Sequence, residues 1–160
     1  MEKFNEVEGN LIVKALKGDF DVVVHGCNCF CTMGAGIAPH MAKNFGCDVF
    51  PLEHEDYRGD INKLGQIDYD VTLLTSGKPL IAVNAYTQYG FGDKYTEGSS
   101  QPLNYYALAL CLQKLNKTFK GKHIGMPLIG CGLAGGNWEV VKELIIKNMP
   151  DVTVTIVHFK

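Results

Sequence analysis

Short apolar runs alternate with longer amphipathic stretches along most of this 160-residue chain. This alternation is typical of an α/β protein, in which helices pack on the faces of a sheet. Three helices are predicted, at residues 36–45, 103–115 and 138–148. Six strands are predicted, at residues 4–8, 22–25, 71–74, 80–85, 123–127 and 152–158.

The strands at residues 71–74 and 80–85 are separated by residues 75–78, whose sequence is Thr-Ser-Gly-Lys. Turn residues between two short apolar runs are typical of a hairpin. We therefore predict an antiparallel pair, which makes the sheet a mixed one. Residues 46–70 are polar, and a short helix near residues 53–64 is the only element predicted there.

The predicted helix at residues 103–115 is preceded by capping residues. Ser99 or Ser100 can cap its start, and Pro102 is tolerated in the first turn because an N–H there would have no partner. Apolar residues at helical spacing are expected to form the face toward the sheet. They are Leu103, Ala107, Leu110, Cys111 and Leu115.

Composition and charge exclude several classes of protein. The net charge is −2, and no run of Lys or Arg is dense enough to predict nucleic-acid binding. The longest apolar run, residues 107–112, is too short to span a membrane, and the first residues lack the order of a signal peptide. No repeat or linker divides the sequence. We expect a cytoplasmic, monomeric protein with one domain over residues 1–160.

Six cysteines occur at positions 27, 29, 31, 47, 111 and 131. Without a secretory signal, they are expected to be reduced thiols. The alternation of Cys27, Cys29 and Cys31 is compatible with one face of a strand, but no second Cys or His pair has the spacing of a zinc site. We therefore predict neither a metal nor a cofactor.

Two glycine-rich loops each follow a predicted strand and precede a predicted helix. Taken alone, each also fits glycines that serve only tight packing. Neither has the Walker pattern or the dinucleotide pattern G-x-G-x-x-G. Because ligands of open α/β sheets bind beyond the carboxyl ends of strands, the loop amides are expected to hold one diphosphate together. The loop residues are Gly34, Ala35, Gly36 and Ile37, and Gly130, Cys131, Gly132, Leu133 and Ala134.

Several strings taken together resemble macro domains. They are HGCNC at residues 25–29, MGAGIA at 33–38 and MPLIGCGL at 126–133, with Trp138 behind, and VEGNL at residues 7–11. The branch they resemble most holds terminal ADP-ribose protein glycohydrolase and the small ADP-ribose-1''-phosphate phosphatases. The resemblance implies a three-layer α/β/α macro-domain fold with a mixed sheet of about six strands and a cleft for ADP-ribose.

The resemblance also implies roles for single residues. Carried over by position, the adenine would contact Gly9, Asn10 and Leu11, the diphosphate would contact residues 34–37 and 130–134, and the distal ribose would contact Asn28, Thr87 and Gln88. Residues 85–92, which include several aromatic side chains, would equally fit a cover over the core.

Two positions decide which reaction the resemblance implies. The glycohydrolases use a lysine and an aspartate where this chain has Gln88 and Ala134, and an amide and a methyl group cannot replace them. The phosphatases carry a histidine before the first loop, where this chain has His25, and the pKa of a free imidazole is about 6.5. We therefore predict hydrolysis of ADP-ribose-1''-phosphate to ADP-ribose and phosphate. His25 would act as general acid/base or nucleophile, and Asn28 would position the ribose.

Two other functions remain open from the sequence. The chain could be a non-catalytic ADP-ribose reader, which needs only the loops and Asn10. It could also remove ADP-ribose from protein or nucleic acid through Asn28 and an ordered water. A buried His25 that is satisfied by backbone groups would fit the same sequence.

Overall fold

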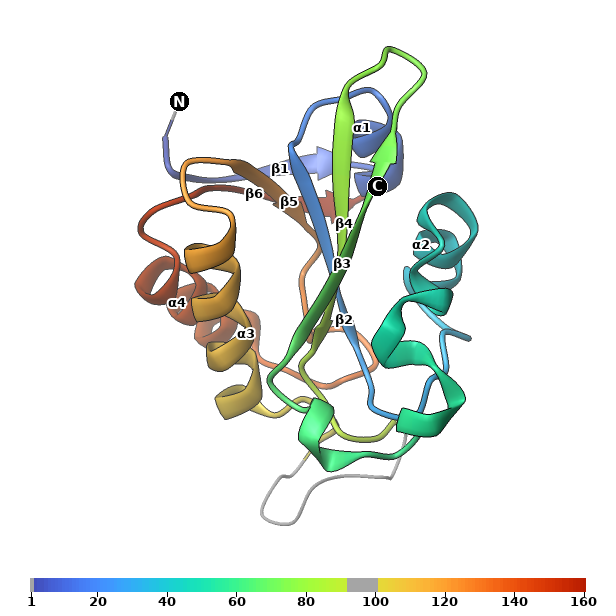
Figure 1. Ribbon diagram of the computed structural model, residues 1–160. Helices are drawn as coiled ribbons and strands as arrows, with labels where there is room; N and C mark the ends of the chain where they lie inside the picture. Colours follow the sequence, from blue (N-terminus) through green and yellow to red (C-terminus); the bar gives the residue numbers. More distant parts are fainter. Residues whose placement is uncertain (1, 92–100) are drawn as a thin grey trace.

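The computed structural model describes residues 2–91 and 101–160. A six-stranded sheet with the order β1-β6-β5-β2-β4-β3 forms its centre (Figure 1). All neighbouring strands pair in parallel except β3, which is antiparallel to β4. The strands are β1 (Phe4–Gly9), β2 (Val22–Cys27), β3 (Ile67–Leu73), β4 (Pro79–Tyr86), β5 (His123–Met126) and β6 (Thr153–Phe159).

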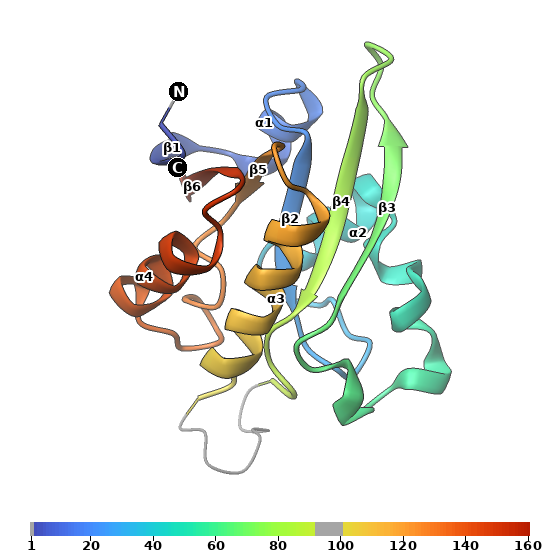
Figure 2. The same cartoon turned by 60° about the vertical axis from the view of Figure 1, so that its left-hand side comes forward.

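Helices cover both faces of the sheet, as Figures 1 and 2 show. Two hydrophobic clusters fill the spaces between sheet and helices. Val22 and Val24 of β2 belong to the cluster under α3 and α4, and Val23 belongs to the cluster under α1 and α2, because successive strand residues point to opposite faces. The helices are α1 (Leu11–Leu16), α2 (Ala38–Phe45), α3 (Tyr105–Thr118) and α4 (Trp138–Asn148).

The predicted α/β class and mixed sheet are confirmed, including the β3–β4 hairpin. The sequence did not predict α1: no element is predicted between the strand at residues 4–8 and the strand at residues 22–25. The Oδ1 atom of Asn10 accepts a hydrogen bond from the Val13 amide at 3.1 Å and so caps this helix. Only Leu11 and Ala15 of α1 are buried. Two buried positions are too few to show a helical period in the sequence.

The short helix predicted near residues 53–64 is wrong: residues 47–63 form four separate 3₁₀ turns instead. Extended residues at Phe50, His54 and Arg58 end one turn before the next begins. The side chains of His54 and Asp60 each accept a hydrogen bond from the amide two residues ahead, and this local capping competes with a continuous α-helix. The turns are η1 (Cys47–Val49), η2 (Pro51–Glu53), η3 (Glu55–Tyr57) and η4 (Ile61–Lys63).

The start of α3 also differs from the prediction. Asn104 is its N-cap and accepts a hydrogen bond from the Ala107 amide at 3.0 Å. Pro102 therefore precedes the helix, and buried Leu103 pairs with Gln88 in an isolated antiparallel bridge. The predicted caps, Ser99 and Ser100, lie outside the described residues.

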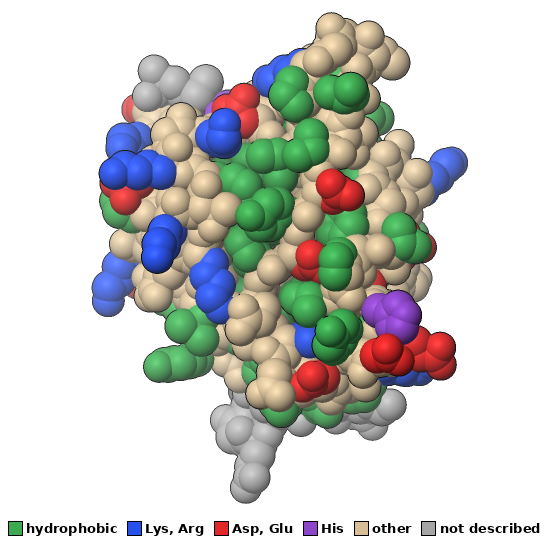
Figure 3. Space-filling view, viewed as in Figure 1, with side chains coloured by type: hydrophobic (Ala, Val, Ile, Leu, Met, Phe, Trp, Pro, Cys, Tyr) green, Lys and Arg blue, Asp and Glu red, His purple; other side chains and the backbone are tan. Residues whose placement is uncertain are grey.

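Hydrophobic side chains gather on the face that carries β3, as Figure 3 shows. Tyr69, Val71 and Leu73 alternate along this edge strand and are exposed. Their spacing of two places them on the same side of the sheet as α3, where Tyr69 packs edge-on against Phe119, the residue that caps the end of that helix. Within residues 2–91 and 101–160, no helix has the length and apolar character of a membrane span.

Asn137 caps the start of α4, directly after the second glycine loop. The Oδ1 atom of Asn137 accepts hydrogen bonds from the amides of Glu139 and Val140 at 2.9 and 3.4 Å. Asn137→Ala should lower the free energy of unfolding by about 1 kcal/mol, because two helix-end amides lose their acceptor. Asn137→Ser should retain most of that stability in urea unfolding. Equal losses in both variants would show that the cap contributes nothing.

Candidate functional site

The two glycine loops lie side by side beyond the sheet. Strands β2 and β5 are parallel neighbours, with Val22 paired to Ile124 and Val23 to Gly125, so their carboxyl ends point to the same edge. The loops that leave these ends line one cavity of about 560 Å³. This volume lies within the usual range for small-molecule sites.

The cavity brings together most residues that the sequence analysis assigned to the diphosphate and distal ribose. Asn28 and Gln88 line it, as do residues 34–37 and 130–134. Glycine is needed at some of these positions because of the backbone conformation: φ is +65° at Gly36 and +74° at Gly130. At Gly34 and Gly132, a Cβ atom would extend into open space.

The main polar groups of the two loops are backbone amides. The N–H groups of residues 34–37 and 132–134 donate to no acceptor within the described part of the chain. Clusters of free amides ahead of a helix create a partially positive surface that favours an anion. The lining is therefore suited to a phosphate group even without a charged side chain.

Charged side chains are absent from the described part of the lining: it includes no Asp, Glu, His, Lys or Arg. Two thiols, Cys27 and Cys131, do line the cavity, and burial raises the pKa of both. Both are neutral thiols at neutral pH and therefore poor nucleophiles. No group of three His, Cys, Asp or Glu residues is placed to hold a metal ion anywhere in residues 2–91 and 101–160.

His25 does not line the cavity, so the structure does not support its predicted direct role in proton transfer. The residue is fully buried, and its Nε2 lies 2.6 Å from Oδ1 of Asn84. Because the Asn84 amide nitrogen donates to the Cys47 carbonyl, the Asn84 oxygen accepts and His25 Nε2 carries the proton. Burial lowers the pKa of His25 to about 4. The Nε2 atom of the neutral ring also lies 3.4 Å from Sγ of Cys27. Because Cys27 lines the cavity, His25 contacts the cavity wall from behind and not the cavity itself.

Four other predicted residues lie outside the cavity lining. Asn10 caps α1, and Leu11 is buried in the core. Gly9 pairs with Phe159 at the end of β1, which places Asn10 close to the rim. Thr87 is fully buried, and its hydroxyl oxygen lies 2.9 Å from where a Cβ atom on Gly26 would be.

The side chain of Asn28 is held within its own loop. Its Nδ2 donates to the Thr32 carbonyl oxygen at 3.1 Å and lies 2.9 Å from the Thr32 hydroxyl. Its Oδ1 accepts from the Phe30 amide at 2.8 Å. Both Asn28 and Thr32 line the cavity, so these bonds fix the shape of that wall.

The sequence analysis did not identify the apolar residues that complete the lining. Val157 and Phe159 come from the end of β6, and Phe159 is 85% exposed. Met33 and Phe91 contribute from the loops that follow β2 and β4. The period-two spacing of Val157 and Phe159 was the available signal, because it places both side chains on one face of the last strand.

Protonation of His25 links the stability of the fold to pH. The folded-state pKa of about 4 lies below the value of about 6.5 expected for the unfolded chain. The unfolded chain therefore takes up this proton first as the pH falls. The stability that neutral His25 supplies is fully present above pH ~6.5 and is lost toward pH ~4, a change on the order of 3 kcal/mol.

This pH dependence can be measured with His25→Gln, whose amide can still donate to Asn84. Between pH 7 and pH 4, the wild type should lose on the order of 3 kcal/mol more unfolding free energy than His25→Gln, which has no imidazole to protonate at this position. His40→Gln, at an exposed position, is the matched control for the loss of an imidazole. A difference that stays constant with pH for His25→Gln would contradict the assignment of a buried neutral ring.

The sequence and the fold of this chain were compared with those of known proteins. No protein-family model matches the chain. The chain is 30% identical, over 161 aligned positions, to an uncharacterized 17.5 kDa protein from the tk-vs intergenic region of Enterobacteria phage T4. The match covers 94% of this chain and 98% of the phage protein.

Three solved structures share the fold at low sequence identity. A Bacteroides thetaiotaomicron protein of unknown function has a TM-score of 0.69 and 23% identity, with 99% of this chain and 98% of that one covered. The macrodomain of Mycobacterium tuberculosis DarG has a TM-score of 0.69 and 20% identity, with 96% of each chain covered. Thermosipho africanus DarTG, solved in complex with ADP-ribose, has a TM-score of 0.68 and 16% identity, with 98% of this chain and 42% of that one covered. The chain therefore belongs to the same family as the phage T4 protein, and its fold is that of a macro domain.

Proposed function

We propose that the cavity binds ADP-ribose and that the amides of the two glycine turns hold its diphosphate. The observation that carries this proposal is the set of amides at residues 34–37 and 132–134 that have no acceptor within the described chain. They line one cavity, and its described lining has no charged side chain. A diphosphate supplies the acceptors that these amides lack.

The order of the strands supports the same ligand. Along the sheet, β6, β5, β2 and β4 follow one another, so the cavity runs from Phe159 past the two turns to Gln88. A ligand with a ring at each end and a diphosphate between them fits this sequence of surfaces. The exposed aromatic ring of Phe159 offers a stacking surface for adenine. At the other end, Asn28 and Gln88, whose amide nitrogens donate to the Thr32 and Gly90 carbonyls, form the wall that would face the distal ribose. Thermosipho africanus DarTG, which shares the fold, was solved in complex with ADP-ribose, and this supports the choice of ligand.

Filling the space at one glycine tests the binding site without disturbing the core. A Cβ at Gly132 would contact no atom within 4 Å, and Gly132 does not have a positive φ. Gly132→Val should therefore leave the melting temperature near the wild-type value. It should weaken ADP-ribose binding by at least about tenfold, or ~1.4 kcal/mol, in calorimetry. Unchanged affinity in this folded variant would argue against a diphosphate at the second turn.

The reaction that we propose at this site is hydrolysis of ADP-ribose-1''-phosphate. Gln88 and Ala134 both line the cavity, where the glycohydrolases that the sequence resembles use a lysine and an aspartate. The described lining therefore offers no acid to protonate a poor leaving group. A phosphate at C1'' leaves without an enzyme acid more easily than an alkoxide does. When the C1''–O bond breaks, its electron pair stays on the phosphate oxygen, where the phosphate group stabilises the negative charge. Water supplies the new oxygen at C1'', and its proton passes to the departing phosphate or to solvent.

Asn28 is the side chain that we propose to orient the distal ribose. The purified protein should release phosphate from ADP-ribose-1''-phosphate. Asn28→Ala should lower kcat by at least about tenfold while the affinity for ADP, which lacks the distal ribose, stays unchanged. His25→Gln should retain more activity than Asn28→Ala, because His25 lies outside the cavity.

The same assay separates the other possible functions. ADP-ribosylated protein and ADP-ribosylated DNA are incubated in parallel, and free ADP-ribose is measured. Release from these macromolecules without release of phosphate would replace the phosphatase by an ADP-ribosyl hydrolase. Tight ADP-ribose binding with no turnover of any substrate would identify a reader. Loss of turnover in a fully folded His25→Gln would restore a direct role for that ring.

A further inference from the structure

A buried ion pair lies behind the first loop, outside the cavity lining. Lys63 of η4 and Glu53 of η2 are joined by an Nζ–Oε2 distance of 3.5 Å, and each side chain is only 2% exposed. The Tyr86 hydroxyl donates to the same carboxylate oxygen at 3.1 Å. Lys63 Nζ also lies 4.9 Å from the centre of the Tyr86 ring. The lysine comes from the segment of 3₁₀ turns, which contributes no residue to the cavity.

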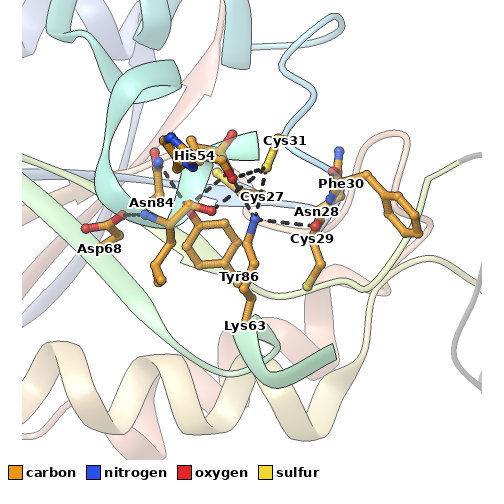
Figure 4. Close-up of polar contacts among 12 residues, drawn as sticks. Cys27, Asn28, Cys29, Phe30, Cys31, His54, Lys63, Asp68, Asn84 and Tyr86 are labelled. Atoms are coloured by element: carbon orange, nitrogen blue, oxygen red, sulfur yellow. Dashed lines mark hydrogen bonds and ion pairs between the residues drawn. The ribbon is translucent and has the colours of Figure 1, made fainter. Parts of the chain in front are cut away.

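The ammonium group of Lys63 contacts the loop itself (Figure 4). Its Nζ donates to the Cys29 carbonyl oxygen at 3.3 Å and to Sγ of Cys31 at 3.4 Å. The Gly59 amide donates to the same Cys29 oxygen at 2.7 Å. Cys31 has a φ of +59°, and among the described residues it is the one non-glycine with a positive value. A left-handed conformation of this kind persists only where surrounding contacts hold it.

These contacts determine the shape of the turn that carries Asn28. Cys29 is held on its other side as well, because its amide donates to the Tyr89 carbonyl at 2.9 Å. The Tyr89 hydroxyl in turn donates to the Gly59 carbonyl at 2.9 Å. The backbone after Asn28 is therefore fixed between the 3₁₀ segment and the residues that follow β4. Asn28 and Thr32, at the two ends of this turn, face the cavity.

Stability alone does not explain the ion pair. Removing two charges from water is costly, and a well-packed apolar pair of similar volume is often as stable or more stable. What an apolar side chain cannot do is donate hydrogen bonds to Cys29 and Cys31 at once. The geometry thus favours a role in fixing one loop conformation.

We propose that Lys63 is a positioning residue that sets the Asn28–Thr32 turn and thereby gives the cavity its preference for ligands with a distal ribose. This inference rests on the proposed binding of ADP-ribose. The glycine turns bind the diphosphate without help from Lys63, because residues 34–37 and 132–134 lie outside its contacts. Lys63 therefore affects the ribose end of the ligand and leaves the diphosphate end unaffected.

The test compares ADP-ribose with ADP in calorimetry on the full chain. Lys63→Met alone would leave the Glu53 carboxylate buried and unpaired, which can unfold the protein. The informative variant is therefore Lys63→Met/Glu53→Gln, whose glutamine can still accept from Tyr86. Its affinity for ADP should equal that of the wild type. Its affinity for ADP-ribose should fall at least about tenfold, so that the preference for the distal ribose is lost.

Two control variants isolate the contact with the loop. Glu53→Gln alone keeps the bonds from Lys63 to the loop and should keep the preference. Lys114→Met removes another lysine that donates to a backbone carbonyl, that of Gly65 at 2.7 Å, and should also keep it.

The outcomes distinguish the inference from the function on which it rests. If the wild type itself does not bind ADP-ribose, the proposed function fails. If the wild type prefers ADP-ribose and the double variant retains that preference, the positioning role is overturned. An equal loss for ADP and ADP-ribose would also overturn it, because that result indicates a general effect on the fold.

Discussion

Parallel pairing of β2 and β5 is the constraint that creates the cavity. Because the two strands run in the same direction as neighbours, the loops that follow them leave the sheet at one edge. The pairing also requires close packing behind it: a Cβ on Gly125 of β5 would lie 2.5 Å from the Phe20 ring. A register or direction change here would separate the two glycine turns and remove the site.

The cavity obtains its polarity from the backbone. Amides that have no acceptor in the described chain face a lining whose described residues include no charged side chain, so a bound anion would be stabilised by fixed dipoles. Charged groups lie behind the cavity wall: the Lys63–Glu53 pair supports the Asn28 turn from the back. Under the proposed function, this separation would let one set of contacts bind the diphosphate while another shapes the site around the distal ribose.

The sequence was sufficient for the parts of the structure that have a local signal. Helix α4 has the predicted bounds, 138–148, and both glycine loops line one cavity as expected. The burial of His25 away from the cavity could not be predicted, because β2 is buried along almost its whole length and a strand of this kind has no polar alternation to show which side chains face which side. The burial of Lys63 could not be predicted either. A lysine in a polar segment without periodicity is expected to be exposed. Only the tertiary fold places the ammonium group of Lys63 against the Cys29 carbonyl.

The central claim is that two separate turns hold one diphosphate. It is tested most directly by following backbone amide chemical shifts of labelled protein during titration with ADP-ribose. The account predicts that amides of residues 34–37 and 132–134 shift together and saturate at the same ligand concentration. Shifts confined to one turn, or shifts in the two turns with different saturation points, would contradict it.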